Sequence, residues 1–286
     1  MSEAYGAELT SIRSPRVKAA RQLGKRAFRL RAGSFLAEGP QAAGEALARD
    51  GVVTELFLTA AARSRHGGLA ARAGRQGAAV HVVSGEVMAQ LAQTVTPQGI
   101  LAVCRFVDVP LAALTAAALR LVVILASVRD PGNAGTVLRT ADAAGAGGVV
   151  FSDASVDPYN SKCVRASAGS IFHTGLVLGG PLADTVGQLR AAGLRVLAAD
   201  GRTGQPLDQV EPRGVLGEPT AWLFGNEAWG LPDDVLALAD ETVAVPIYGQ
   251  AESLNLAAAA AVCLYSSARA QRGNAGGGCR AAPATR

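Results

Sequence analysis

The sequence predicts an α/β protein of two domains, of which the second is built on a parallel sheet. The chain has 286 residues, which suggests about two domains of common size. From residue 121 onward, short continuously apolar stretches alternate with helical segments. Strands of that kind are buried on both faces, as in a parallel sheet that helices cover from both sides. With 49% hydrophobic and 17% charged residues, the chain can bury the core that this fold requires.

A smaller α/β domain is expected over residues 1–107, followed by a linker over residues 108–119. The expected strands are 35–37, 52–58, 79–83 and 94–104, and the expected helices are 16–31, 41–49, 69–74 and 86–92. Ser84 should cap the last of these helices, because its hydroxyl can accept from the first free backbone N–H groups. Pro110 favours an irregular linker.

The larger domain is expected over residues 120–270. Its expected strands are 121–127, 148–151, 176–178, 195–199, 221–224 and 242–245, and its last expected helix is 254–270. Residues 271–286 are rich in Gly and Ala and are expected to form a disordered tail.

Positive charge is concentrated at the start of the chain. Residues 1–31 hold eight basic and two acidic side chains, whereas the whole chain carries a net charge of +4. On a helix over residues 16–31, three- and four-residue spacing would place Lys18, Arg21, Lys25 and Arg29 on one face. Such a stripe suits contacts to nucleic-acid phosphates. A solvated helix face fits the same pattern equally well.

The sequence favours a cytoplasmic protein without a metal site. The four cysteines form no C-x-x-C pair and have no histidine at zinc-ligand spacing, so we expect reduced thiols. Residues 1–10 lack the apolar region of a signal peptide. The longest apolar stretch, residues 256–265, is about half of the roughly 20 residues that a spanning helix needs.

Three polar, glycine-bearing segments follow expected strands, at residues 130–139, 225–232 and 246–256. Ligands of parallel sheets bind beyond the carboxyl ends of the strands, so these segments are candidate site loops. In the first, Asn133 could cap a helix that carries Arg139. In the third, Ser253 could cap the last helix, while Asn255 would cost helix propensity inside it. A capped helix, a surface turn and a back-bonded polar residue remain the structural alternatives.

Other motifs that bind nucleotides or activate a nucleophile are either absent or stand in the wrong order relative to the expected helices and strands. The glycine-rich residues 144–148 follow a helix and precede a strand, the reverse of the dinucleotide-binding order. There is no G-x-x-x-x-G-K-[ST] loop and no G-x-S-x-G serine. A nicotinamide-linked oxidoreductase is therefore a weak rival.

The three segments, in this order, resemble the signature motifs of the SpoU/TrmH family of RNA ribose 2′-O-methyltransferases, within the SPOUT superfamily. The matches are N-x-G-x-x-x-R from Asn133, G-N-E-x-x-G-L from Gly225, and P-I with S-L-N from Pro246. Residues 157–172 resemble the family's segment after the second strand, except that Ser161 stands where proline is expected. Residues 1–107 are similar to the family's ribosomal-protein-like substrate-binding domain.

The resemblance implies a trefoil knot in the parallel-sheet domain, a homodimer with active sites at the subunit interface, and S-adenosylmethionine as cofactor. Residues facing the methyl acceptor would be Asn133, Arg139, Glu227, Ser253 and Asn255. Residues binding the methyl donor would be Phe224, Gly225, Asn226, Gly230, Val245, Ile247 and Leu254. RNA contacts are expected at Arg16, Lys18, Arg21, Lys25, Arg29, Lys162, Arg165 and Ser167.

The expected reaction is 2′-O-methylation of a ribose in structured RNA. The separate N-terminal domain with its basic helix resembles the family's ribosomal-RNA methylases, which favours ribosomal over transfer RNA. A transfer-RNA enzyme and a non-catalytic RNA-binding protein are the alternatives. Because an arginine side chain keeps its proton in proteins, we hypothesise that Arg139 clamps a phosphate and orients the hydroxyl rather than acting as a general base.

Overall fold

The computed structural model describes residues 7–274, which form two compact units. The first unit joins the chain up to Asp108 with Asp130–Arg139 and Val156–His173. The second unit contains Val109–Arg129, Thr140–Ser155 and the chain from Thr174 onward. The first unit thus includes two segments from beyond the boundary that the sequence suggests at residue 107.

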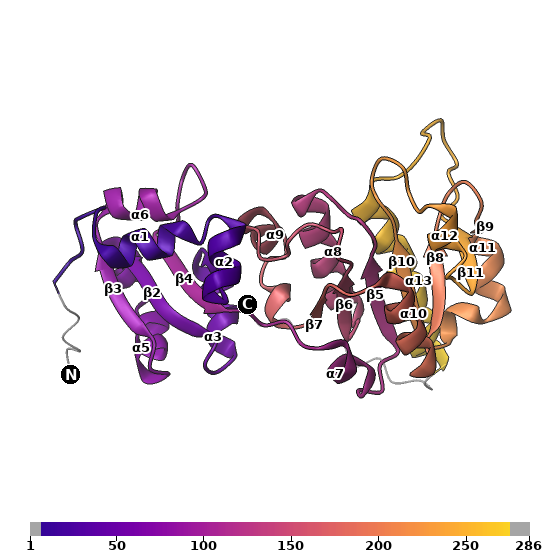
Figure 1. Cartoon of the computed structure of the whole chain (residues 1–286), viewed down its shortest axis with the longest axis horizontal. Coiled ribbons are helices and arrows are strands. Elements are labelled where there is room, and N and C mark those ends of the chain that lie inside the picture. Colours follow the sequence, from indigo (N-terminus) through magenta and orange to yellow (C-terminus); the bar gives the residue numbers. More distant parts are fainter. Residues whose placement is uncertain (1–6, 275–286) are drawn as a thin grey trace. The chain divides into compact units, whose positions relative to one another are not determined.

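The first unit is built on a four-stranded sheet in the order β1-β4-β2-β3. Its strands are β1 (Ser34–Glu38), β2 (Val53–Thr59), β3 (Ala79–Val83) and β4 (Ile100–Arg105). β4 pairs antiparallel with β1 and β2, whereas β2 and β3 are parallel. On one face lie α1 (Pro15–Gln22) and α6 (Gly85–Leu91), and on the other lie α3 (Pro40–Ala48), α4 (Ala60–Arg65) and α5 (Gly67–Arg75) (Figure 1). Helix α4 was not predicted, and β4 begins later than expected.

The single basic helix predicted over residues 16–31 is wrong. The chain forms α1 and then α2 (Arg26–Ala32), separated by a turn in which Gly24 N–H and Lys25 N–H donate to carbonyls of the last turn of α1. The four basic residues of the predicted stripe therefore do not share a helix face. The predicted cap of α6 is confirmed, since Ser84 Oγ accepts from Val87 N–H at 3.3 Å.

The second unit confirms the predicted parallel sheet, with seven strands in the order β7-β6-β5-β10-β8-β11-β9. They are β5 (Leu121–Leu125), β6 (Gly148–Phe151), β7 (Gly175–Leu178), β8 (Arg195–Ala199), β9 (Gln205–Pro206), β10 (Thr220–Phe224) and β11 (Glu241–Ala244). Only the two-residue β9 was not predicted. The predicted linker holds a short helix, α7 (Leu111–Thr115).

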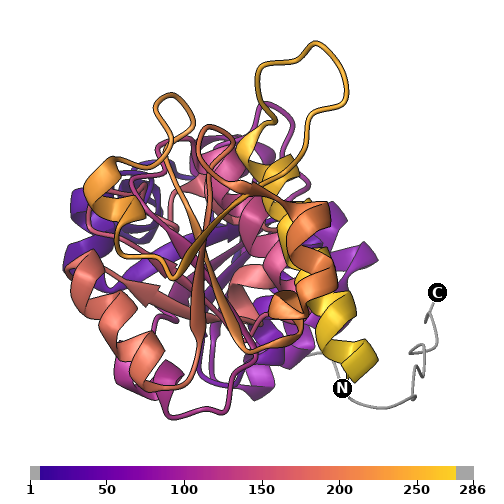
Figure 2. The same ribbon diagram turned by 90° about the vertical axis from the view of Figure 1, so that its right-hand side faces the viewer.

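Helices cover both faces of this sheet, as Figure 2 shows for α10 (Leu182–Ala191) and α13 (Leu256–Asn274). Val186 and Leu189 of α10 join the apolar cluster of one face. On the other face, Trp222 Nε1 donates to Ser267 Oγ of α13 at 2.9 Å. The remaining α-helices are α8 (Pro131–Ala144), which begins in the first unit, α9 (Ser161–Ala166) of the first unit, and α11 (Leu207–Val210) and α12 (Asp233–Leu236) of the second.

Helix α13 extends beyond its predicted end. Gln271 Nε2 donates to the carbonyls of Arg120 and Glu218, which anchors the last turns of the helix. The predicted disordered tail is therefore wrong for residues 271–274, and its remainder, 275–286, lies outside the described residues. Among the described helices, none is long and apolar enough to cross a membrane.

Candidate functional site

The loop after β10 closes on itself between two glycines. Asn226 N–H donates to Gly230 O at 3.0 Å, and Gly230 N–H donates to Asn226 O at 2.9 Å. A Cβ added at Gly225 would lie 2.4 Å from Gly230 O, which is too close for any side chain. Gly230 has φ +71°, in the region that favours glycine. The loop conformation therefore requires both glycines.

Asn226 links this loop to the end of the neighbouring strand β5. Its side chain is buried, donates from Nδ2 to Ser127 O at 2.8 Å and accepts at Oδ1 from Ala228 N–H at 2.8 Å. Ser127 has φ +58°, which is uncommon for a residue with a Cβ and is maintained by its surroundings. Asn226 was predicted to bind the methyl donor. Its hydrogen bonds stabilise the loop after β10 and hold it against the end of β5.

Two serines that follow β6 form hydrogen bonds with the backbone at the end of β5. Ser152 Oγ accepts from Ser127 N–H at 3.0 Å. Ser155 Oγ accepts from Val128 N–H at 3.2 Å and donates to Leu125 O at 2.8 Å. Hydrogen bonds thereby join the carboxyl ends of β6, β5 and β10. Neither serine was predicted as a site residue, and their only local signal is a position just after an apolar strand.

Polar and apolar side chains are exposed around these strand ends. Glu227 is exposed, and its Oε2 accepts from Arg129 N–H at 3.2 Å. Trp229 is 54% exposed, and after β11 Ile247 and Leu254 are 38% and 40% exposed. Exposed large apolar side chains in loops at the carboxyl ends of parallel strands offer contact area to a ligand.

Asn255 and Ser253 do not lie inside the last helix. The helix begins at Leu256, and Asn255 Oδ1 accepts from Ala257 N–H at 2.9 Å. Asn255 is therefore the N-cap, so the predicted cost in helix propensity and the predicted cap at Ser253 are wrong. Ser253 is exposed in the preceding loop.

In the first unit, Asp130 caps helix α8. The predicted cap at Asn133 is therefore wrong. Asp130 Oδ1 accepts from Asn133 N–H at 2.8 Å, and Oδ2 accepts from Lys162 Nζ at 2.7 Å. The hydrogen bond from Lys162 and that from Asn133 hold the pKa of Asp130 below its usual range. Asn133 is the third residue of α8, and Arg139 is exposed further along it.

Gly135 allows α8 to approach α9 closely. A Cβ at this position would lie 2.3 Å from Cys163 O, so the glycine of the first motif has a packing role. Asn160 caps α9 by accepting from Lys162 N–H at 2.9 Å, and Ser161 is the first residue of the helix. Proline suits a first helical position but is not required there, so the departure at Ser161 leaves the helix intact.

Two of the predicted RNA contacts are wrong. Arg29 is only 3% exposed, and its guanidinium is engaged by Asp157. Ser167 is fully buried and donates to Val164 O at 2.8 Å. Neither side chain can reach RNA, because both are buried. The predictions failed because the spacing of residues in the sequence does not show which later segment will cover them.

The remaining predicted RNA contacts lie nearer the surface. Arg16 is exposed and pairs with Glu55 at 3.2 Å, and Arg21 Nη1 donates to Gln90 Oε1 at 3.4 Å. Lys18 and Lys25 are exposed, whereas Arg165 is half-buried. The Lys162 side chain is 57% exposed despite its bond to Asp130.

The predicted site residues fall into both units. Asn133 and Arg139 belong to the first, whereas Glu227, Ser253 and Asn255 belong to the second. The second also holds the predicted donor-binding residues: Phe224, which is buried in β10, Gly225, Asn226, Gly230, Val245, Ile247 and Leu254. Across residues 7–274, no three His, Cys, Asp or Glu side chains are grouped to hold a metal.

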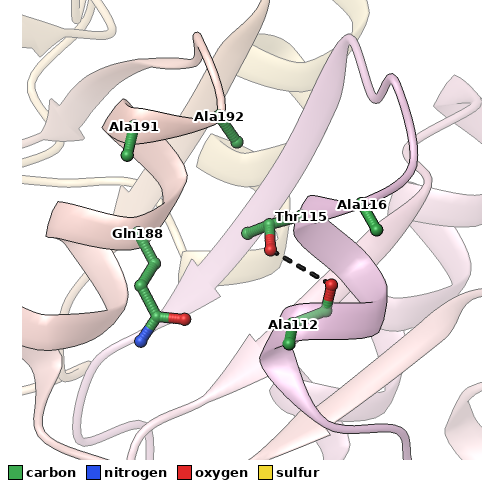
Figure 3. A pocket seen from close by; sticks show the side chains of 6 residues that line it. All are labelled: Ala112, Thr115, Ala116, Gln188, Ala191 and Ala192. Atoms are coloured by element: carbon green, nitrogen blue, oxygen red, sulfur yellow. Dashed lines mark hydrogen bonds between the residues drawn. The ribbon is translucent and has the colours of Figure 1, made fainter.

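A separate hollow of about 370 Å³ lies between α7 and α10 (Figure 3). It is lined by Ala112, Thr115, Ala116, Gln188, Ala191 and Ala192. Its one hydroxyl is occupied, since Thr115 Oγ1 donates to Ala112 O. Because the end of α7 precedes β5 and the end of α10 precedes β8, the hollow lies toward the amino ends of the strands. It has no group for catalysis.

Two family models match the chain. Residues 120–265 match the SpoU rRNA Methylase family, and residues 14–102 match the MRM3-like substrate binding domain. A relative from Bacillus subtilis, 23S rRNA (guanosine(2553)-2′-O)-methyltransferase RlmP, is 34% identical over 258 residues. That match covers 90% of this chain and 98% of the relative, so both domains are shared.

Solved structures of methyltransferases are also similar to this chain over most of its length. An AdoMet-bound rRNA methyltransferase from Sinorhizobium meliloti superposes with a TM-score of 0.79 and 31% identity, covering 92% of this chain and 97% of that one. The SpoU methyltransferase AviRb from Streptomyces viridochromogenes, in complex with AdoMet, gives a TM-score of 0.75 and 29% identity. The latter match covers 91% of this chain and 98% of AviRb.

Proposed function

Because the chain belongs to the SpoU rRNA methylase family, we propose that it transfers a methyl group from S-adenosylmethionine to a ribose 2′-hydroxyl of 23S ribosomal RNA. The observation that carries the proposal is the hydrogen bond from Asn226 to Ser127 O. It joins the second motif loop to the end of β5, from which the chain runs directly into the first motif. Ligands of parallel sheets bind at such strand ends.

The loops after β10 and β11 suit the proposed cofactor. Adenosylmethionine has an apolar adenosyl part, and the exposed Ile247 and Leu254 offer matching apolar surface. Val245 is half-buried at the start of the same loop, and the glycines at 225 and 230 have no side chain to keep a ligand from the backbone. When bound, the cofactor supplies an electrophilic methyl group on a sulfonium.

We assign the acceptor side of the reaction to Asn133, Arg139, Glu227, Ser253 and Asn255. Methyl transfer is an in-line displacement, so holding the 2′-oxygen in position supplies much of the acceleration. The exposed Arg139 is a permanent fork-shaped donor that suits a phosphate oxygen and an adjacent hydroxyl. Glu227 and the two asparagines add polar groups that can orient the ribose.

We also propose the knot, the homodimer, a cytoplasmic location and the domain division of residues 1–107 for RNA and 120–270 for catalysis. After β11, which pairs with β8 and β9, the chain returns to pack α13 against β10 and β5. That crossing of the sheet supports a knotted path. Val262 and Tyr265 of α13 are 40% and 46% exposed, which supports a partner subunit on this helix.

Ribosomal RNA is favoured over transfer RNA because the similarity to the Bacillus relative extends through the substrate-binding domain. The test is transfer of labelled methyl from S-adenosylmethionine to separate pools of unmodified ribosomal and transfer RNA. Label recovered as a 2′-O-methylnucleoside from ribosomal RNA is expected. Label only in transfer RNA would overturn the substrate assignment. No transfer to either pool or to assembled ribosomal particles, with cofactor bound, would indicate a non-catalytic RNA-binding protein.

A further inference from the structure

A second group of arginines lies in the first unit, away from the basic residues of α1. The segment Ala60–Arg75, which spans α4 and α5, contains Arg63, Arg65, Arg72 and Arg75 and no acidic residue. Its charge of +4 equals the net charge of the whole chain. Arg65 and Arg75 are exposed, and Arg72 is half-exposed. The predicted RNA contacts included none of these residues.

Two arginines of α1 and α2 are already paired with carboxylates. Arg16 forms an ion pair with Glu55, and Arg29 is buried against Asp157. Within residues 7–274, by contrast, Arg65, Arg72 and Arg75 form no ion pair. Asp50, which lies beside the end of α5, is bonded by Gln76 at 2.6 Å. The charges of Arg65, Arg72 and Arg75 are therefore left for an external anion.

The two groups lie on opposite faces of the four-stranded sheet. Val17 and Ala20 of α1 pack into the cluster formed with Phe57 and Leu101. Helices α4 and α5 pack against β2 and β3 from the other side, where Ala62, Ala70 and Ala73 are buried (Figure 1). One straight stretch of RNA lying on α1 cannot also contact α5, because the sheet separates them.

We propose that Arg65, Arg72 and Arg75 form a second RNA-binding surface, which holds phosphates of an RNA segment other than the one that contacts α1. The inference rests on the proposed function and extends it: the substrate is an RNA large enough to reach both faces of the substrate-binding unit. Phosphate contacts of this kind add affinity without reading sequence. They anchor the substrate while the residues at the strand ends select the ribose.

The test is the salt dependence of binding to an unmodified 23S ribosomal RNA transcript. Each phosphate contact adds about 0.7 to 0.9 to the slope of log affinity against log salt concentration. The triple variant R65Q/R72Q/R75Q should therefore lower the magnitude of the slope by about 2 and raise KM for the transcript, with kcat unchanged. R65K/R72K/R75K should keep most of the slope, because the charge is retained.

The matched control removes the same charge elsewhere. Arg190, Arg213 and Arg269 of the second unit each form an ion pair with Asp240, Glu241 and Glu211, respectively. R190Q/R213Q/R269Q should leave the slope unchanged. An equal loss of slope in this control would show a general charge effect and would overturn the proposal, as would an unchanged slope in R65Q/R72Q/R75Q. If that triple variant fails to fold, R75E alone should still reduce the slope.

The outcome is separable from that of the proposed function, because binding is measured without methyl transfer. A wild-type protein that methylates the transcript while the triple variant keeps the full slope would refute this surface and leave the function standing. A wild-type protein that binds with the expected slope but transfers no methyl would refute the function and leave the surface standing.

Discussion

Arg29 and Asp157, which are 128 residues apart in the sequence, form a buried ion pair in the first unit. Asp157 Oδ2 accepts from Arg29 Nη2 at 2.6 Å and from Nε at 3.1 Å. Arg29 Nη1 donates to the carbonyls of Leu23 and Gly24, and Asp157 Oδ1 accepts from Tyr159 N–H. Both charges are therefore satisfied, and the pair fastens α2 to the segment 156–173.

Removing one partner of this pair should be costly. Arg29→Met leaves the Asp157 charge buried, and we expect it to lower the free energy of unfolding by about 3 kcal/mol. The double variant R29M/D157L removes both charges and should recover much of that loss. Urea denaturation of the wild type, both single variants and the double variant measures the coupling. Additive losses would contradict a direct interaction.

Tyr159 should stabilise the chain around residue 108. Its hydroxyl accepts from Val107 N–H at 2.8 Å and from Asp108 N–H at 2.9 Å, and donates to the Asp108 carboxylate at 2.5 Å. Burial, together with Asp108, raises the pKa of Tyr159, so the hydroxyl keeps its proton. Tyr159→Phe leaves two backbone donors without this acceptor and should cost about 1 to 3 kcal/mol. Tyr248→Phe serves as control, because its side chain is 87% exposed, and should leave the unfolding midpoint unchanged.

Gly225→Ala should weaken cofactor binding while the protein stays folded. The added methyl group would meet Gly230 O at 2.4 Å, so the loop after β10 must open. We expect the Kd for S-adenosylmethionine, measured by calorimetry, to rise at least about tenfold, equivalent to roughly 1.4 kcal/mol. Gly187→Ala is the control, since a Cβ there meets nothing within 4 Å. Unchanged binding by G225A would disprove the role of this loop.

Arg139→Lys should show whether the planar guanidinium group is required in addition to the positive charge. Lysine keeps the positive charge but loses the planar fork, so the acceptor ribose is misplaced. We expect methyl transfer to fall on the order of 10²-fold, with an unchanged Kd for S-adenosylmethionine. Single-turnover rates between pH 6 and 9 measure the effect. Full activity of R139K across this range would refute the clamp.

Asp240 should contribute to acid unfolding. Burial by itself raises the pKa of Asp240, but hydrogen bonds from Val196 N–H and Arg190 outweigh it and leave the pKa below its usual value. A carboxylate with a lowered folded-state pKa stabilises the protein above its unfolded pKa of about 3.9 and loses that stabilisation as the pH falls through the folded value. Asp240→Asn should therefore be less stable at pH 7 and show a flatter stability curve below about pH 4. Parallel curves for the two proteins would exclude this contribution.

The sequence by itself determined the parallel sheet and the place of the site loops. Strands β6 and β8 have the bounds that the apolar stretches predicted, because a strand buried on both faces is apolar along most of its length, and only Arg195 at the start of β8 is charged. The glycine-bearing motifs likewise follow β5, β10 and β11, since glycine and polar residues favour the turns by which a chain leaves a sheet.

The tertiary structure alone decided which polar residues serve the fold and which remain exposed to a substrate. Arg29 was predicted to contact RNA, yet Asp157 buries it; Asn133 was predicted as a cap, yet Asp130 performs that role and is itself held by Lys162. The serines at 152 and 155 support a loop some 25 residues earlier in the chain. Such roles depend on partners that are distant in sequence, and local spacing or propensity contains no information about which distant segment folds against a side chain.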